Sequence, residues 1–227
     1  MAIKTITIST AKGGSGKSTL AQCLAVQLGR SALLDLDPQL DSLHWSKLRA
    51  EHHPERGIPC AKIRDAGDVT NAKRELAGYD FLIIDTPPSH QGTGELRKIF
   101  LASDFVLVPI HPSPKDLRAA YTTVQALRAL GVPHAAVLSV ANPRTAITSE
   151  AKALLGDSAV EIAPVIITRL TSYPETAVDG RTPLDLPGDT KPKGEFRDLG
   201  AWLREKLNQG AEINGTAETP TLRQLHA

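Results

Sequence analysis

The chain has 227 residues, a formal net charge of +1 at pH 7 and 41% hydrophobic residues. This apolar fraction is enough to bury a core and excludes a disordered chain, and the length favours one large domain. The near-neutral charge gives no electrostatic indication of nucleic-acid binding, and an aromatic content of 4% disfavours a base-stacking surface for single strands.

Cysteines and apolar runs restrict the class of protein further. Cys23 and Cys60 are too few for a disulfide framework, and their separation fits no zinc-binding spacing. No apolar run approaches the roughly 18 residues of a membrane span. The first residues lead directly into an apolar run, without a leader of the signal-peptide type. We therefore expect a cytoplasmic protein.

Taken in chain order, apolar runs alternate with stretches of helical periodicity. The runs predict strands over residues 3–8, 32–36, 81–84, 105–110, 135–140 and 164–167. Helical periodicity predicts helices over residues 17–28, 93–102, 114–130, 148–155 and 195–207. The runs are rich in Val, Ile and Leu and do not alternate with polar residues, as is typical of strands covered on both faces. The sequence predicts an α/β fold with a mostly parallel twisted sheet and helices on both faces.

Two segments near the end lack such periodicity. Residues 182–194 are rich in Pro, Gly and Asp and are expected to form a surface loop. Residues 208–227 contain Gly, Thr and Glu without an apolar period, which predicts a disordered tail. The predicted organisation is one domain over residues 1–207 followed by this tail.

The strongest motif is a phosphate-binding loop between the first predicted strand and the first predicted helix. Glycines let successive N–H groups face one anion, and the helix N-terminus adds its dipole. Lys17 can reach the β- and γ-phosphates of a nucleotide, and the Ser18 hydroxyl can ligate Mg²⁺. The predicted ATP-binding residues are Gly13, Gly14, Ser15, Gly16, Lys17, Ser18 and Thr19.

Carboxylates follow two of the predicted strands. Asp35 and Asp37 lie on the same side of the end of one strand, where ligands of open α/β sheets bind. A carboxylate there can orient the water that attacks the γ-phosphate. Asp35 is expected to support Mg²⁺ or a switch loop. Asp85 ends a run of four apolar residues, as in a Walker B motif, and is expected to hold Mg²⁺ through a water or through Ser18.

Lys12 places a second lysine before the glycines, and the string Lys-Gly-Gly-Ser-Gly-Lys-Ser resembles the deviant Walker A motif of the ParA/MinD superfamily. The resemblance implies that Lys12 reaches across a dimer to the nucleotide of the partner subunit, as an arginine finger does. The segment Asp-Leu-Asp-Pro-Gln resembles the Asp-x-Asp-Pro-Gln of ParA proteins, which assigns hydrolysis to Asp37. Lys12, Lys17 and Asp37 are the predicted catalytic residues.

The resemblance extends over about residues 1–207. The segment Ser42-Leu43-His44-Trp45 is similar to one in short plasmid ParA proteins, and Pro112-Ser113-Pro114-x-Asp116 precedes a helix that commonly lies at the family's dimer face. Asn142 occupies the position at which the family reads adenine. Arg169, Tyr173, Ala177 and Gly180 are similar to a late family segment.

Features that this sequence lacks separate it from other branches of the superfamily. No cysteine follows Cys60, as the cluster of the nitrogenase iron-protein branch would require. No tyrosine follows Tyr173, whereas the tyrosine-kinase branch ends in a tyrosine cluster. The tail has one basic residue, Arg223, and contains Pro220, unlike the basic membrane helix of MinD. There is no room before Ile3 for an N-terminal helix-turn-helix, so a small form without operator binding is expected.

The resemblance implies an ATPase that needs ATP and Mg²⁺, forms an ATP-bridged homodimer, and binds nonspecific DNA in that state, which would associate it with the nucleoid. A ParB-like or other adaptor protein would stimulate hydrolysis, and the cargo would be plasmid DNA or another cellular body. No linear basic patch exists, so a DNA surface would be assembled by folding and dimerisation. Candidate DNA contacts are Arg144, Arg169, Arg181, Lys191, Lys193, Arg197 and Arg204.

Two other functions remain open. One is a positioning ATPase for a cargo other than a plasmid, such as a carboxysome or a chemoreceptor cluster. The other is a biosynthetic ATP-dependent ligase of the same fold, for dethiobiotin or cobyrinic-acid amide synthesis. The ligase would need a pocket for an organic acid and would have no use for Lys12.

Overall fold

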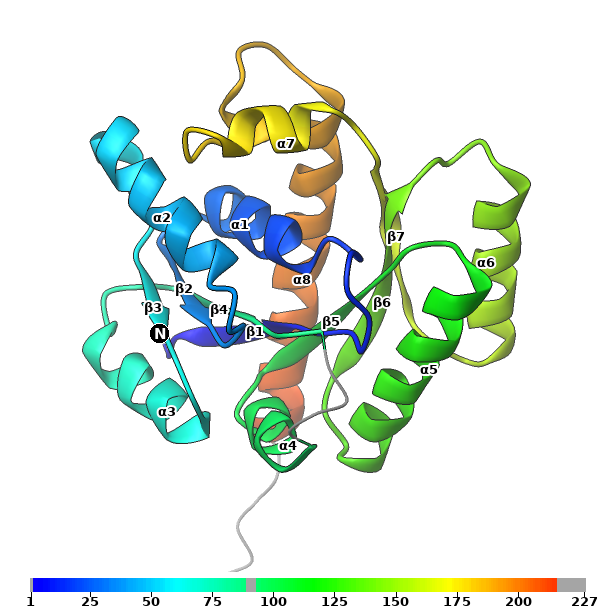
Figure 1. Cartoon of the computed structure of the whole chain (residues 1–227). Coiled ribbons are helices and arrows are strands. Elements are labelled where there is room, and N and C mark those ends of the chain that lie inside the picture. Colours follow the sequence, from blue (N-terminus) through cyan, green and yellow to red (C-terminus); the bar gives the residue numbers. More distant parts are fainter. Residues whose placement is uncertain (1, 89–92, 216–227) are drawn as a thin grey trace, which may run out of the picture.

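Seven strands lie in one sheet in the order β3-β2-β4-β1-β5-β6-β7, and every neighbouring pair is parallel (Figure 1). The computed structural model describes residues 2–88 and 93–215. The strands are β1 (Lys4–Ile8), β2 (Ser31–Asp35), β3 (Cys60–Lys62), β4 (Phe81–Asp85), β5 (Phe105–Ile110), β6 (His134–Ala141) and β7 (Ile162–Thr168). The mostly parallel sheet expected from the apolar runs is confirmed.

Helices cover both faces of this sheet, as predicted. They are α1 (Lys17–Leu28), α2 (Asp41–His52), α3 (Ala66–Glu75), α4 (Thr93–Leu101), α5 (Pro114–Ala129), α6 (Ala146–Asp157), α7 (Ser172–Ala177) and α8 (Lys191–Gly215), with single 3₁₀ turns η1 (Pro54–Arg56) and η2 (Pro183–Asp185). One face packs against α1, α2 and α8, and the other against α3 to α6. Successive residues of β4 alternate between the two cores, Ile83 in one and Ile84 in the other, so a strand here must be apolar on both sides.

The order of the strands places a crevice next to β1. The chain leaves β1 for β2 and later crosses from β4 to β5, so β1 lies between β4 on one side and β5 on the other. Connections at such a reversal diverge at the carboxyl ends of the strands and leave a ligand site there. The segment between β1 and α1 runs through this point.

Four elements were missed by the sequence reading. Edge strand β3 has only three residues, all at least partly exposed, so it carries no apolar run. Helix α2 has few apolar residues, and its buried set includes Ser42, Ser46 and Arg49. Helices α3 and α7 are short and bury only Val69 and Thr176, respectively. Such elements follow from tertiary contacts more than from hydrophobic periodicity.

The expected surface loop over residues 182–194 is wrong at both ends, because residues 183–185 form η2 and residues 191–194 belong to α8. Thr182 and Pro183 are buried, and η2 begins with a capping box between Thr182 and Asp185. Pro183 and Asp185, which suggested a loop, instead form part of a capped turn that packs against α1, α7 and α8 and pairs with Arg49 of α2.

The last helix is longer than predicted. Helix α8 begins at Lys191 and ends at Gly215, so residues 208–215 continue the helix. The rest of the expected tail, residues 216–227, lies outside the described residues. No helix in the described part of the chain is long and apolar enough to cross a membrane.

Candidate nucleotide-binding site

The phosphate loop connects β1 to α1 in the crevice beside β1. Gly14 and Gly16 have φ angles of 76° and 82°, a region that glycine adopts without steric cost. A Cβ at Gly16 would lie 3.2 Å from Cγ2 of Val140. The Ser139 hydroxyl donates to the Ser15 carbonyl at 2.8 Å. The loop is therefore held tightly against the end of β6.

Lys17 lies within this loop and is buried. Its Nζ donates to the Lys12 carbonyl at 3.0 Å. Burial lowers the pKa of Lys17, while Asp85 and Asp37 nearby favour its charged form. Lys17 also lines a cavity of about 350 Å³ together with Asp37 and the predicted loop residues Gly13, Gly14, Gly16, Ser18 and Thr19. The structure therefore brings the predicted phosphate-binding residues together around one cavity; Ser15 alone does not line it.

Asp85 has the surroundings of a carboxylate that supports Mg²⁺. Its side chain is fully buried, and Oδ2 accepts a hydrogen bond from the Ser42 hydroxyl at 2.8 Å. Burial raises the pKa of Asp85 to about 7, and Asp35 adds to the effect, while Ser42, Ser18 and Lys17 oppose it. Oδ1 is buried and has no hydrogen-bond partner among the described residues.

This unpaired oxygen fits a magnesium ion held through water. Within residues 2–88 and 93–215, no three His, Cys, Asp or Glu side chains converge on one metal position. Mg²⁺ keeps several waters and is usually bound through one or two protein groups and the substrate phosphates. Ser18 and Asp85 supply that kind of set.

Asp35 lies next to Asp85 on the neighbouring strand, and the two residues are in register. Its Oδ1 accepts from the Asp37 N–H and its Oδ2 from the Leu43 N–H, both at 3.0 Å. Of the two roles predicted for Asp35, these contacts favour support of the loop between β2 and α2. Asp37 is placed by that loop, and its own Oδ1 accepts from the Gln39 N–H at 2.9 Å.

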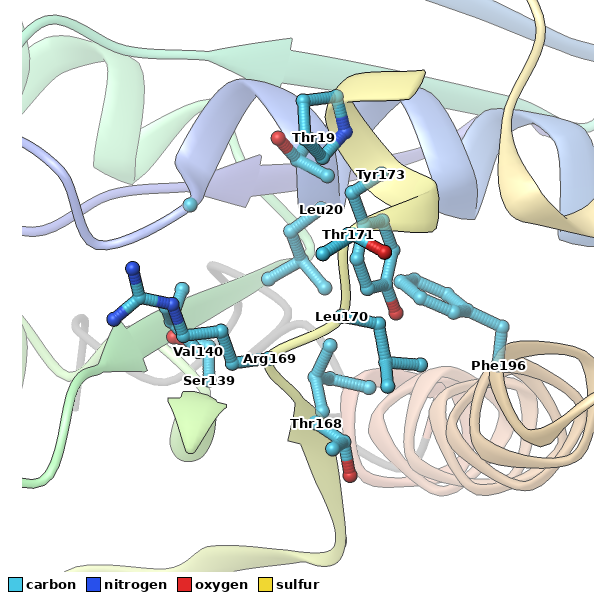
Figure 2. A pocket seen from close by; sticks show the side chains of 13 residues that line it. Thr19, Leu20, Ser139, Val140, Thr168, Arg169, Leu170, Thr171, Tyr173 and Phe196 are labelled. Atoms are coloured by element: carbon cyan, nitrogen blue, oxygen red, sulfur yellow. The ribbon is translucent and has the colours of Figure 1, made fainter. Parts of the chain in front are cut away.

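A second, more apolar cavity of about 500 Å³ adjoins the phosphate loop (Figure 2). Gly16 and Thr19 line both cavities. The wall of the second cavity is formed by Leu20 of α1, the end of β6, the segment after β7 and Phe196 of α8. In Figure 2, Leu170 and Tyr173 are seen between Leu20 and Phe196, and the Arg169 side chain points away from them. A cavity of this size and character can enclose a nucleoside.

The predicted adenine contact, Asn142, does not line this cavity. Asn142 is exposed, and its Oδ1 accepts from the Arg144 N–H at 3.0 Å in the turn before α6. The residues of β6 that do line the cavity are Ser139 and Val140, and Val140 has a φ of 52°. A β-branched residue in this region is strained, and strain of this kind tends to be found at ligand sites.

Lys12 lines neither cavity and forms an ion pair within its own subunit. Its Nζ is 2.8 Å from Oδ2 of Asp116, in the first turn of α5. The carboxylate of Asp116 is 7% exposed and the Lys12 side chain is 42% exposed.

The candidate DNA contacts do not gather on one surface. Arg144 and Arg169 follow the carboxyl ends of β6 and β7. Arg204 is at the opposite end of the sheet, where it donates to the Leu28 carbonyl at 2.6 Å and stacks over Phe81 at 4.7 Å. The other candidates have partners within the chain, including Arg181 with Asp179 at 2.8 Å and Arg197 with Asp189 at 3.9 Å. Arg204 is thus mainly a packing residue.

The sequence reading did not identify three residues that support this site. Ser42 had been noted only as part of a family-like segment, Asp116 likewise, and Ser139 not at all. Each acts through a hydrogen bond to a motif residue that is distant in sequence. A lone serine or aspartate at the end of a strand or the start of a helix carries no pattern that marks such a contact.

The parallel sheet, the glycine loop between β1 and α1, and the acids at the ends of β2 and β4 define a P-loop nucleotide-binding protein. A sequence profile of the "CobQ/CobB/MinD/ParA nucleotide binding domain" family matches residues 6–184. The chain belongs to this family, and it is of the ParA/MinD type.

Individual relatives agree with this assignment. The "Maintenance of carboxysome distribution protein A" of Halothiobacillus neapolitanus is 27% identical over 184 residues, covering 78% of this chain and 84% of the relative. "Protein ParA" of Rhizobium radiobacter is 24% identical over 182 residues, covering 74% of this chain and 79% of the relative. The solved structure of the MinD cell division protein of Aquifex aeolicus has a TM-score of 0.69 at 17% identity, covering 89% of this chain and 97% of that one. The MinD structure shows the shared fold.

Proposed function

We propose that the protein is an ATPase that forms a dimer when it binds ATP with Mg²⁺. Hydrolysis of the ATP would return the dimer to monomers. The observation that carries this proposal is that Lys17 and Asp37 line one phosphate-sized cavity beside a nucleoside-sized one, with the buried Asp85 close to Lys17. Family membership supports the same activity. Lys12, the lysine of the motif that lines neither cavity of its own subunit, supports the need for a second subunit.

Each residue would have a separate part in hydrolysis. Lys17 would leave the Lys12 carbonyl and neutralise the β- and γ-phosphates. Asp37 would accept a hydrogen bond from the attacking water and orient it. Ser18 and Asp85 would hold Mg²⁺, which screens the phosphate charges when it is bound. Lys12 of each subunit would add positive charge at the γ-phosphate of the other.

Light scattering tests the dimer directly. An Asp37→Ala variant should retain ATP unhydrolysed, so its mass should double with ATP and Mg²⁺ and stay that of a monomer with ADP. Lys17→Ala should lose nucleotide binding, because it removes the charge that faces the phosphates. Lys12→Ala should keep nucleotide binding in the single subunit and lose dimerisation and hydrolysis. Equal loss of ATP affinity in both lysine variants would refute a role for Lys12 in trans.

We further propose that the ATP-bound dimer binds duplex DNA without sequence preference. The support is the family assignment together with exposed basic residues near the carboxyl ends of β6 and β7, Arg144 and Arg169. Each phosphate that the dimer neutralises should contribute a slope of about −0.9 to log affinity against log salt. Retention of the Asp37→Ala protein on random-sequence DNA at several salt concentrations tests this. No retention even at about 50 mM salt would exclude binding of the ATP-bound dimer to DNA.

The cargo is proposed to be plasmid DNA or another large cellular body, brought to the dimer by a ParB-like or other adaptor that stimulates hydrolysis. The similarity to "Maintenance of carboxysome distribution protein A" favours a carboxysome as a second candidate. Deletion of the gene in its host separates the two. Clustered or unequally inherited carboxysomes would support the second candidate, and plasmid loss with normal carboxysomes would exclude it.

A further inference from the structure

The ion pair between Lys12 and Asp116 links the phosphate loop to the first turn of α5. Lys12 Nζ donates to Asp116 Oδ2 at 2.8 Å. The Ser113 hydroxyl, which caps α5, donates to the same carboxylate oxygen and accepts from the Asp116 N–H at 3.2 Å. Burial acts to raise the pKa of Asp116, but Lys12, Ser113 and nearby His111 outweigh it and hold that pKa below its usual value. The carboxylate is thus a charged, mostly buried anchor at the end of β5.

The contact holds Lys12 inside its own subunit. A lysine whose ammonium is bound to Asp116 does not at the same time reach the nucleotide of a second subunit. The Lys12 carbonyl is also occupied, because it accepts from Lys17 Nζ at 3.0 Å. In the proposed function, the phosphates of ATP would withdraw Lys17 from that carbonyl, and this exchange by itself gives Lys12 Nζ no replacement for the Asp116 carboxylate. A second event is needed to free the Lys12 side chain.

We propose that Asp116 is a positioning residue that retains Lys12 in its own subunit and thereby sets the protein concentration at which ATP-bound subunits pair. This inference rests on the proposed function, in which Lys12 acts across the dimer. The phosphate charge of the partner's nucleotide replaces the carboxylate as the ligand of Lys12. The ion pair lowers the fraction of monomers that are ready to pair, and neutralising Asp116 removes that restraint.

The size of the effect follows from the exposure of the pair. Lys12 is 42% exposed, so the pair belongs with solvent-accessible ion pairs, whose strength reaches about fivefold in an equilibrium constant. A symmetric dimer releases one pair in each subunit. The dimer dissociation constant of Asp116→Asn should therefore be about 25-fold lower than that of the parent at saturating ATP.

The variant needs a control that also removes an acid from the first turn of a helix. Asp68 has the same place in α3 that Asp116 has in α5, the third helical position, and it also contacts a basic residue, Arg64, at 3.5 Å. It lies outside the residues that line either nucleotide cavity. Asp68→Asn thus controls for the loss of a carboxylate near a helix N-terminus.

Dilution series followed by light scattering measure the dimer dissociation constant in the Asp37→Ala background with ATP and Mg²⁺. We expect Asp116→Asn to tighten the dimer, Asp116→Glu to restore the parental value and Asp68→Asn to leave it unchanged. An Asp116→Asn dimer that is equally strong or weaker overturns the inference. If Asp116→Asn does not fold, as judged by circular dichroism, Asp116→Ser replaces it.

A second measurement tests whether Asp116 restrains Lys12 without relying on dimerisation. In the nucleotide-free protein, acetylation of Lys12 by a limiting amine reagent can be compared by mass spectrometry with that of the exposed Lys115 in the same helix turn as Asp116. Asp116→Asn should raise the rate for Lys12 about fivefold relative to Lys115, and an unchanged ratio overturns the inference. If the parent stays monomeric with ATP, the proposed function fails, whereas the labelling ratio still reports whether Asp116 retains Lys12.

Discussion

Replacement of Arg49 by methionine should destabilise the fold more than any surface change, because Arg49 joins α2 to η2 inside the molecule. The Arg49 side chain is 3% exposed. Its guanidinium makes a bidentate pair with Asp185, two hydrogen bonds of 2.9 Å. It also donates to the Gly180 carbonyl at 3.0 Å and to the Arg56 carbonyl at 2.7 Å. Methionine keeps much of the volume and removes all four bonds.

The cost follows from what the substitution leaves behind. Asp185 would remain as a buried carboxylate, 5% exposed. It would keep its hydrogen bonds from Thr182 and, as its remaining cationic neighbour, the more exposed Arg56 at 3.8 Å. Removing one partner of a buried ion pair costs about 3–5 kcal/mol in unfolding free energy. In a domain of this size, 1 kcal/mol lowers the melting temperature by roughly 2–4 °C, so the loss should be about 6–20 °C.

Urea unfolding followed by circular dichroism measures this loss. Arg49→Met, Asp185→Asn and the double variant form a cycle, and the coupling between the two positions should exceed about 1 kcal/mol. Arg204→Met is a suitable control, since it removes a guanidinium that stacks on Phe81 and has no acidic partner among the described residues. A loss below about 1 kcal/mol for Arg49→Met would refute the reasoning, because it would place the pair among exposed ones.

Three further predictions concern pH, the phosphate loop and the magnesium site. Burial opposes ionisation of Asp185, but Arg49 and Thr182 outweigh burial and hold the pKa of Asp185 below its usual value. The resulting stability is present above about pH 4 and is lost as the pH falls through the folded-state pKa. Urea unfolding from pH 3 to 7 should show this loss of stability in the parent and not in Arg49→Met. Gly16→Ala should weaken nucleotide binding about tenfold or more, since its φ is 82° and the new Cβ would meet Val140 at 3.2 Å. Gly29→Ala, at a φ of 61° with nothing within 4 Å, should cost stability and leave fluorescent-nucleotide binding unchanged. Ser42→Ala should raise the Mg²⁺ concentration needed for ATP binding about tenfold by removing the hydrogen bond to Asp85, while Ser46→Ala, which loses a 2.6 Å bond to the Ile58 carbonyl one turn further along α2, should not; equal effects of the two serine changes would contradict this.

The strands and the phosphate loop were determined by local sequence. Buried parallel strands must be apolar on both faces, so each long strand appeared as a continuous run, and 105–110 was predicted to the residue. The loop glycines are required by positive φ angles at Gly14 and Gly16, which almost no other residue adopts cheaply. Constraints of this kind act between residues that are close in the sequence, so the local sequence is enough to predict them.

Partnerships between distant residues were decided by the tertiary structure. Nothing local to Lys12 shows that it pairs with Asp116, 104 residues away, or that Ser42 supports Asp85, 43 residues away. Residues 182–194 have the composition of a loop because Pro, Gly and Asp are turn formers. Contacts with α1, α7 and α8 and the ion pair with Arg49 nevertheless hold their first part as a capped turn. A hydrogen bond or ion pair depends on which elements the fold brings together, and composition does not contain that information.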